Sequence, residues 1–114
     1  MAAVRRAQAV GFPGLVPIVP ELLGCIQDIN WPIAPPVAGL LQQAGMALVP
    51  AMRDVLRGED GMWKYWVIHE VLMHVDADVL TALKGDLQRL ATHPTADDRD
   101  CEADLAAAEV LNPG

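Results

Sequence analysis

Serine is absent from this sequence of 114 residues, so a serine nucleophile is excluded. Cysteine is scarce: Cys25 and Cys101 are too few and too far apart for a disulfide framework. Both fall on the apolar stripe of an expected helix, where we expect them to be reduced core residues. Cys25 has no histidine near it in the sequence, and the carboxylates around Cys101 should raise the pKa of its thiol. Neither cysteine is therefore expected to act as a nucleophile.

Long apolar runs and glycine-rich phosphate loops are also missing. No stretch approaches the roughly 20 apolar residues of a membrane span, and glycines and prolines interrupt the segment after Arg5-Arg6 that would otherwise resemble a signal peptide. We therefore expect a cytoplasmic protein without a membrane partner. Residues 59–114 carry a net charge of −8, against +1 for residues 1–58. Because this acidic half repels phosphate backbones, we expect no nucleic-acid partner.

The abundant residues are helix formers, and the length fits one domain. We expect an N-terminal arm at residues 1–14 and a helical domain at residues 15–114. Apolar residues at helical spacing predict six helices, at about residues 16–27, 35–44, 47–57, 61–75, 77–92 and 96–111. Asn30 and Asp60 are expected to cap helices, and Thr95 and Asp98 have the spacing of a capping box.

An internal repeat relates the first four expected helices. Leu15-Val16-Pro17 recurs as Leu48-Val49-Pro50, and a tryptophan follows each copy after a similar interval, at Trp31 and Trp63. The last two helices would form a third pair without a tryptophan. Repeats of this length made of helix pairs are typical of helical solenoids. The sequence therefore predicts an all-α fold, a HEAT-like right-handed α-α solenoid of about three helix pairs.

Two motifs carry a resemblance to a known family. They are Gln27-Asp28-Ile29-Asn30-Trp31-Pro32-Ile33-Ala34, preceded by Pro20-Glu21-Leu22-Leu23, and Asp60-Gly61-Met62-Trp63-Lys64-Tyr65-Trp66. Over about residues 15–111 the chain resembles the domain of unknown function 5071 family (DUF5071), with Cys25 where an aromatic residue is common. The resemblance implies a small bacterial all-helical protein related to HEAT repeats, and it transfers no catalytic residue.

The tryptophan motifs also hold the candidate binding residues. These are Asp28, Asn30, Trp31, Asp60, Trp63, Lys64, Tyr65 and Trp66. In a structural interpretation, Trp31 and Trp63 wedge between successive helix pairs, each indole N–H bonds a carbonyl, and an aspartate caps the next helix. In a functional interpretation, five of them line the concave face and anchor a partner: Asn30, Trp31, Lys64, Tyr65 and Trp66. The two interpretations are compatible.

Two clusters have a superficial likeness to metal sites. His69 and His74 are one residue further apart than in the H-E-x-x-H zinc motif, which leaves their rings about 140° apart around one helix. The acidic residues between 97 and 104 lack the pattern of a calcium loop, and we interpret them as a solvated helix start. We expect no metal, no cofactor and no catalytic residue.

The sequence therefore favours a non-catalytic protein-binding module, either an adaptor or an immunity-like inhibitor of a basic protein. Two alternatives stay open. The first is a hydrolase or a nucleic-acid base-acting enzyme on a HEAT-like scaffold, with His69, Glu70 or Asp60 as its reactive groups. The second is a structural self-associating protein such as a homodimer, because open solenoid ends and a high apolar content favour association.

Overall fold

A computed structural model of the chain describes residues 16–28 and 30–112. All regular structure in this part of the chain is helical, which confirms the predicted all-α class. None of the helices described combines the length and the apolar character that crossing a membrane requires. The arm predicted at residues 1–14 lies outside the described residues.

Residues 16–28 and 30–112 form seven α-helices and three short 3-10 helices (η). In order they are η1 (Val16–Ile18), α2 (Val19–Gly24), α3 (Ala34–Leu41), η2 (Gly45–Leu48), α4 (Val49–Arg57), α5 (Gly61–Glu70), η3 (Leu72–His74), α6 (Ala77–Thr92), α7 (Ala96–Asp100) and α8 (Ala103–Leu111). The bounds of α6 are those expected from its apolar stripe. Both α2 and α4 begin with a Val-Pro pair, because proline is tolerated in the first turn of a helix.

Two predicted helices are broken, which corrects the sequence-based bounds. The helix expected at 61–75 is broken at Val71: α5 ends at Glu70, and η3 begins at Leu72. Val71 and Leu72 at this break are both fully buried. The helix expected at 96–111 is divided into α7 and α8 at Cys101 and Glu102. Glu102 has a φ of 61°, in the left-handed region that ends a right-handed helix.

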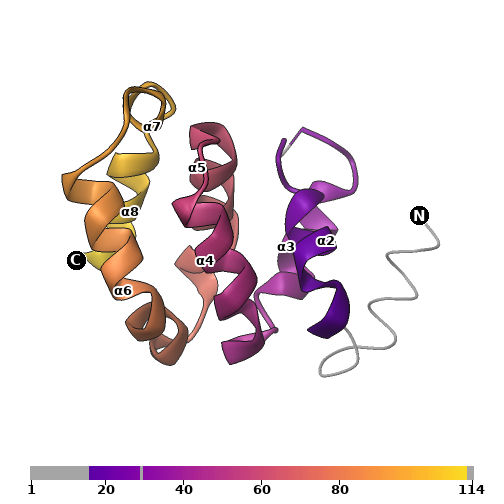
Figure 1. The fold of residues 1–114 in the computed structure, drawn as a ribbon. Helices are drawn as coiled ribbons and strands as arrows, with labels where there is room; N and C mark the ends of the chain where they lie inside the picture. Colours follow the sequence, from indigo (N-terminus) through magenta and orange to yellow (C-terminus); the bar gives the residue numbers. More distant parts are fainter. Residues whose placement is uncertain (1–15, 29, 113–114) are drawn as a thin grey trace.

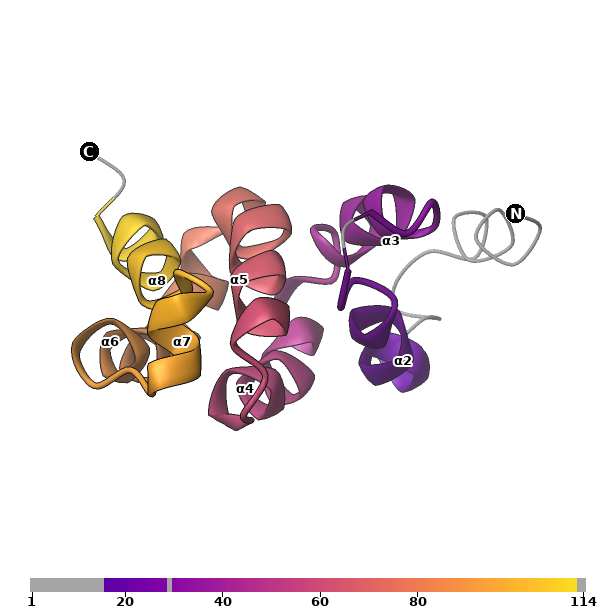
Figure 2. The same ribbon diagram turned by 90° about the horizontal axis from the view of Figure 1, so that it is seen from above.

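The helices form three pairs that stand side by side (Figure 1). α2 packs against α3, α4 against α5, and α6 against α8, and the connections within the pairs all lie at the same edge. Seen from above, α2, α4 and α6 form one layer, and α3, α5 and α8 form the other (Figure 2). α5 is the central helix of its layer and also contacts α7. Its residues can therefore reach all three pairs.

A continuous apolar core runs between the two layers. In α2 its members are Val19, Leu22 and Leu23, and in α4 they are Val49, Met52, Val55 and Leu56. The repeat visible in the structure thus aligns Val19-Pro20 with Val49-Pro50, thirty positions apart. The repeat inferred from Leu15-Val16-Pro17 has a different register. Pro17, the proline of that triplet, lies in η1 rather than at the start of α2.

Candidate functional site

The Asp60–Trp66 motif begins α5, at the centre of the molecule. Asp60 caps the helix as predicted, since its Oδ1 accepts a hydrogen bond from the backbone N–H of Trp63 at 3.0 Å. The next residue, Gly61, donates its backbone N–H to Asp97 Oδ2 at 2.8 Å. A Cβ at Gly61 would lie 2.7 Å from the backbone oxygen of Asp97. Glycine is therefore required for the close approach of α5 and α7.

Lys64 lies one turn further along α5 and is buried. Its Nζ donates a hydrogen bond to Asp98 Oδ1 at 2.8 Å, and both residues are only 2% exposed. Asp98 Oδ2 also accepts from the backbone N–H of Thr95, while Thr95 Oγ1 accepts from that of Asp98, which confirms the capping box. The expectation that Lys64 faces a partner is corrected here, because its ammonium is inside the protein.

The sequence suggested that Asp98 belongs to a solvated helix start. In the structure it is a buried anion. Burial acts to raise the pKa of its carboxyl. The hydrogen bond from Lys64, the backbone hydrogen bond at Thr95 and the positive charge of Lys64 together outweigh burial, so the pKa lies below its ordinary value. Asp98 is therefore ionised at neutral pH and matches the charge of Lys64.

A second buried carboxylate, Asp86 of α6, connects α6 to α4, both of the other layer. Its Oδ1 accepts from Arg57 Nε at 2.8 Å and its Oδ2 from Arg53 Nε at 3.1 Å, both from α4. Burial acts to raise the pKa of Asp86, but the hydrogen bonds and charges of Arg57 and Arg53 hold it below the ordinary value. Sequence reasoning missed this cluster. Its signal was an aspartate between Leu83 and Leu87 on an apolar helix face, where an ionised group needs a partner.

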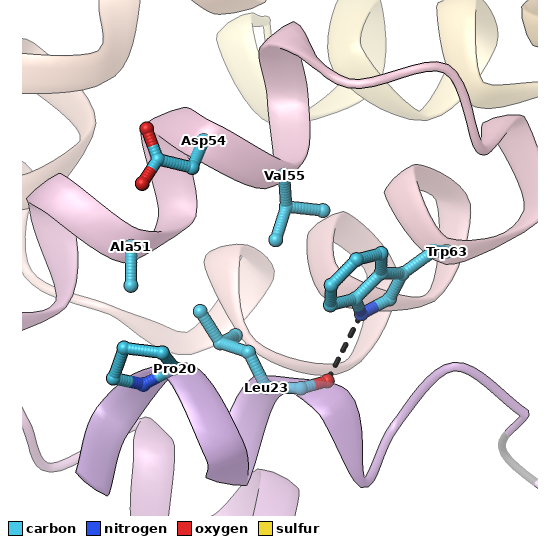
Figure 3. A pocket seen from close by; sticks show the side chains of 6 residues that line it. All are labelled: Pro20, Leu23, Ala51, Asp54, Val55 and Trp63. Atoms are coloured by element: carbon cyan, nitrogen blue, oxygen red, sulfur yellow. Dashed lines mark hydrogen bonds between the residues drawn. The ribbon is translucent and has the colours of Figure 1, made fainter.

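Trp63 extends from α5 to the first helix pair. Its indole Nε1–H donates to the backbone oxygen of Leu23 at 2.9 Å, which confirms the predicted carbonyl bond between successive pairs (Figure 3). The same ring lines a pocket of about 150 Å³ among α2, α4 and α5. The lining residues are Pro20, Leu23, Ala51, Asp54, Val55 and Trp63. Asp54 is the one charged residue among them.

Trp31 lies in different surroundings. It is 44% exposed, in the connection between α2 and α3, so the prediction that it wedges between helix pairs like Trp63 is wrong. Asp28 Oδ1 accepts from the backbone N–H of Asn30 at 2.9 Å and closes a local turn. The N-cap of α3 is Ile33, with no side-chain hydrogen bond, so neither Asp28 nor Asn30 caps that helix. The tryptophans therefore do not mark equivalent corners of a repeat.

The outward face of α5 carries a stripe of large side chains, which we call the α5 stripe: Met62, Tyr65, Trp66 and His69. Met62 is 43% exposed, and the other three are half-buried or exposed. The Tyr65 ring stacks on His69 with centroids 5.6 Å apart and meets Trp66 edge-on at 5.0 Å. The spacing i, i+3, i+4 and i+7 puts all four on one side of the helix. Of the predicted binding residues, Tyr65 and Trp66 thus lie side by side.

The two histidines considered for a metal are separated by the break at Val71. His69 Nδ1 lies 3.2 Å from Glu70 Oε1, at the surface. Within residues 16–28 and 30–112, the structure has no group of three or more His, Cys, Asp or Glu side chains that could hold a metal ion. Both cysteines are free and half-buried. Burial and the carboxylates of neighbouring aspartates, Asp97 foremost, raise the pKa of the Cys101 thiol, as predicted.

One protein-family model matches almost the whole chain. The family model described as a domain of unknown function, DUF5071, matches residues 1–111. The chain belongs to this family. No curated protein matches it. The match extends the similarity seen in the two tryptophan motifs over almost the full length of the chain.

In this DUF5071 chain the second tryptophan motif has two sides. Asp60, Gly61, Trp63 and Lys64 make contacts within the protein, to α2 on one side and α7 on the other. The α5 stripe occupies the other side of the helix, where Met62 and His69 are exposed and Tyr65 and Trp66 are half-buried. The sequence alone did not separate these roles, because a tryptophan or a lysine is found in both buried and exposed positions.

Proposed function

We propose that this DUF5071 chain is a non-catalytic protein-binding module whose α5 stripe contacts the partner. The main support is the α5 stripe, in which the half-buried Tyr65 ring stacks on exposed His69 and meets Trp66 edge-on. Tyrosine and tryptophan are over-represented among the residues that dominate binding energy in interfaces. Stacking also holds these rings in place before binding, which lowers the entropy lost when a partner docks.

The proposed scaffold is a right-handed HEAT-like α-α solenoid of three helix pairs. The support is the succession of pairs in two layers, together with the Val-Pro start shared by α2 and α4 (Figure 2). In such a solenoid each pair contacts mainly its neighbours, and one layer of helices forms an extended binding face. The α5 stripe would occupy the middle of that face.

The partner that we propose is a protein with a basic surface. Residues 59–114, which include α5 to α8, carry a net charge of −8. The buried Lys64–Asp98 pair is neutral, so this net charge of −8 comes from the other residues of the segment. A negative field would steer a basic partner and speed association. This fits an adaptor or an inhibitor of immunity type.

Self-association is the second candidate, and exposed Leu105 of α8 favours it. This leucine is 60% exposed, on the helix that packs beside α5. A second copy could cover both Leu105 and Met62. Light scattering distinguishes the candidates: a dimer that Leu105→Glu dissociates would favour self-association, and a monomer at micromolar concentration would favour a different protein as the partner.

Affinity capture from the native host tests the protein-binding proposal. We expect one partner in stoichiometric amount with the unaltered protein, a strong loss with Trp66→Ala or Met62→Glu, and full retention with Thr81→Ala on the exposed side of α6. Circular dichroism confirms that each variant is folded. A partner held equally by all variants, or no partner at all, would contradict the proposed surface.

A further inference from the structure

The pocket beside Trp63 has the size and chemistry of a site for one side chain. Its volume is about 150 Å³, comparable to cavities that hold a single small ring or alkyl chain. The walls are the Trp63 indole and the side chains of Leu23 and Val55 (Figure 3). The indole N–H is already bonded to the Leu23 carbonyl. An occupant therefore meets apolar surface inside the pocket.

The rim of the pocket is acidic. Asp54, which belongs to the lining, is exposed on α4. The nearest basic residues of α4 do not neutralise Asp54, because Arg53 and Arg57 both donate to Asp86 of α6. Among the ion pairs of the described residues, none involves Asp54. The site thus combines an apolar interior with a negative rim.

We propose that this pocket binds an arginine or lysine side chain of a partner protein. The methylene stem would lie against Trp63 and Leu23, while the cation would reach Asp54 at the rim. Long basic side chains bury their stems on apolar surface and keep the charge in water. The site is distinct from the α5 stripe and does not depend on it.

Other occupants match the pocket less well. A leucine or phenylalanine side chain would fit the volume but gain nothing from the Asp54 carboxylate. An acidic side chain would be repelled by Asp54. The basic side chain alone satisfies both the apolar wall and the charge at the rim.

Small probes test the site without any knowledge of the partner. The probe is n-butylguanidinium, and the matched controls are 1-butanol, which lacks the charge, and butyrate, which reverses it. Nitrogen-15 NMR follows the indole N–H signals. We expect n-butylguanidinium to shift the Trp63 signal in a saturable way and to leave those of Trp31 and Trp66 in place. Butyrate should have no effect, and 1-butanol should bind more weakly.

Two variants separate the contributions of charge and space. Asp54→Asn, at an exposed position, should weaken n-butylguanidinium binding roughly two- to fivefold, as expected for a solvated ion pair. Ala51→Leu should fill the pocket and abolish the shift. An unmoved Trp63 signal, equal shifts of all three indoles, or equal affinity of 1-butanol and n-butylguanidinium would overturn the proposal. Because no partner is used, these outcomes are independent of the capture experiment.

Discussion

The Lys64 ammonium lies 2.8 Å from the Asp98 carboxylate, with both side chains almost completely removed from water. The residue before it in the chain, Trp63, bonds the backbone of Leu23 in the first helix pair. Adjacent residues of α5 thus contact the first pair and α7, the helix that lies between α6 and α8 in the chain. The stability of the three-pair stack therefore depends on the orientation of a single helix.

Replacing Asp98 by Asn removes the negative charge and leaves the Lys64 ammonium buried without a counterion. Loss of one member of a buried pair typically costs about 3–5 kcal/mol, because the remaining charge stays desolvated. We expect Asp98→Asn to lower the free energy of unfolding by about 3 kcal/mol in urea denaturation.

Two further variants make this comparison specific. The double variant Lys64→Met/Asp98→Asn should recover part of the loss, since no charge is then buried. Lys84→Met, which removes an exposed lysine of α6, should change the free energy of unfolding by no more than about 0.5 kcal/mol. A double variant less stable than Asp98→Asn would contradict the assignment of the loss to an unpaired charge.

Stability should fall at acid pH through Asp98 and Asp86. The folded state lowers the pKa of both carboxyls, so their stabilising contribution is fully present above the unfolded pKa of about 4. It is lost as the pH falls through the lower folded values. Urea denaturation from pH 7 to pH 2 should show a free energy of unfolding that declines below about pH 4. The Lys64→Met/Asp98→Asn variant should show a flatter decline, and an unchanged profile would contradict this origin.

Gly61→Ala should be destabilising although alanine is the better helix former. The new Cβ would lie 2.7 Å from the Asp97 backbone oxygen, so α5 and α7 would have to separate. We expect a loss of about 1–3 kcal/mol, typical of overpacking. Gly85→Ala in α6 is the matched control, because nothing lies within 4 Å of its added Cβ. That variant should gain up to about 1 kcal/mol in thermal or urea denaturation. Equal effects at the two glycines would show that the contact with Asp97 is unimportant.

Periodicity predicted the fold class and the helix positions because burial of one face is a local property of sequence. The spacing of apolar residues gave the bounds of α6, and the capping residues Asp60 and Thr95 were visible as caps. The breaks at Val71 and Glu102 were not visible. The expected apolar stripes run on past both positions, with Leu72 and Val75 after Val71 and Leu105 after Glu102, so helical periodicity gave no sign of a break.

The candidate site was less predictable, because burial of a polar residue depends on its partner far along the chain. A lysine such as Lys64 is expected at the surface. It is buried here because Asp98, 34 positions later in the chain, lies beside it. Trp31 and Trp63 share a sequence context, yet the Trp63 indole donates to a carbonyl of another pair, whereas Trp31 has no such bond within the described part of the chain. Sequence spacing identifies the residues of such a site but does not assign them to the interior or to the surface.

The hydrogen bond from Trp63 to Leu23 can be tested apart from the volume of the ring. Trp63→Phe retains an aromatic ring but leaves the Leu23 carbonyl without this donor, for an expected loss of about 1–2 kcal/mol. Trp63→Ala should cost more, about 3–5 kcal/mol. Trp31→Phe, at an exposed position, should change the free energy of unfolding by no more than about 0.5 kcal/mol. Similar losses for Trp31→Phe and Trp63→Phe in urea denaturation would contradict the different roles of the two residues.

Glu102 offers a substitution that should stabilise the protein. Its φ of 61° and ψ of 23° place it in the left-handed region, where an ordinary residue is strained by about 1–2 kcal/mol. Glycine removes that strain but gains entropy in the unfolded chain, so Glu102→Gly should raise the free energy of unfolding by about 0.5–1 kcal/mol. Glu102→Val should lower it, because a β-branched residue is poorly tolerated at positive φ. If thermal denaturation ranks Val above Gly at this position, the backbone between α7 and α8 is not left-handed, and the break that distinguishes these helices would have to be reassigned.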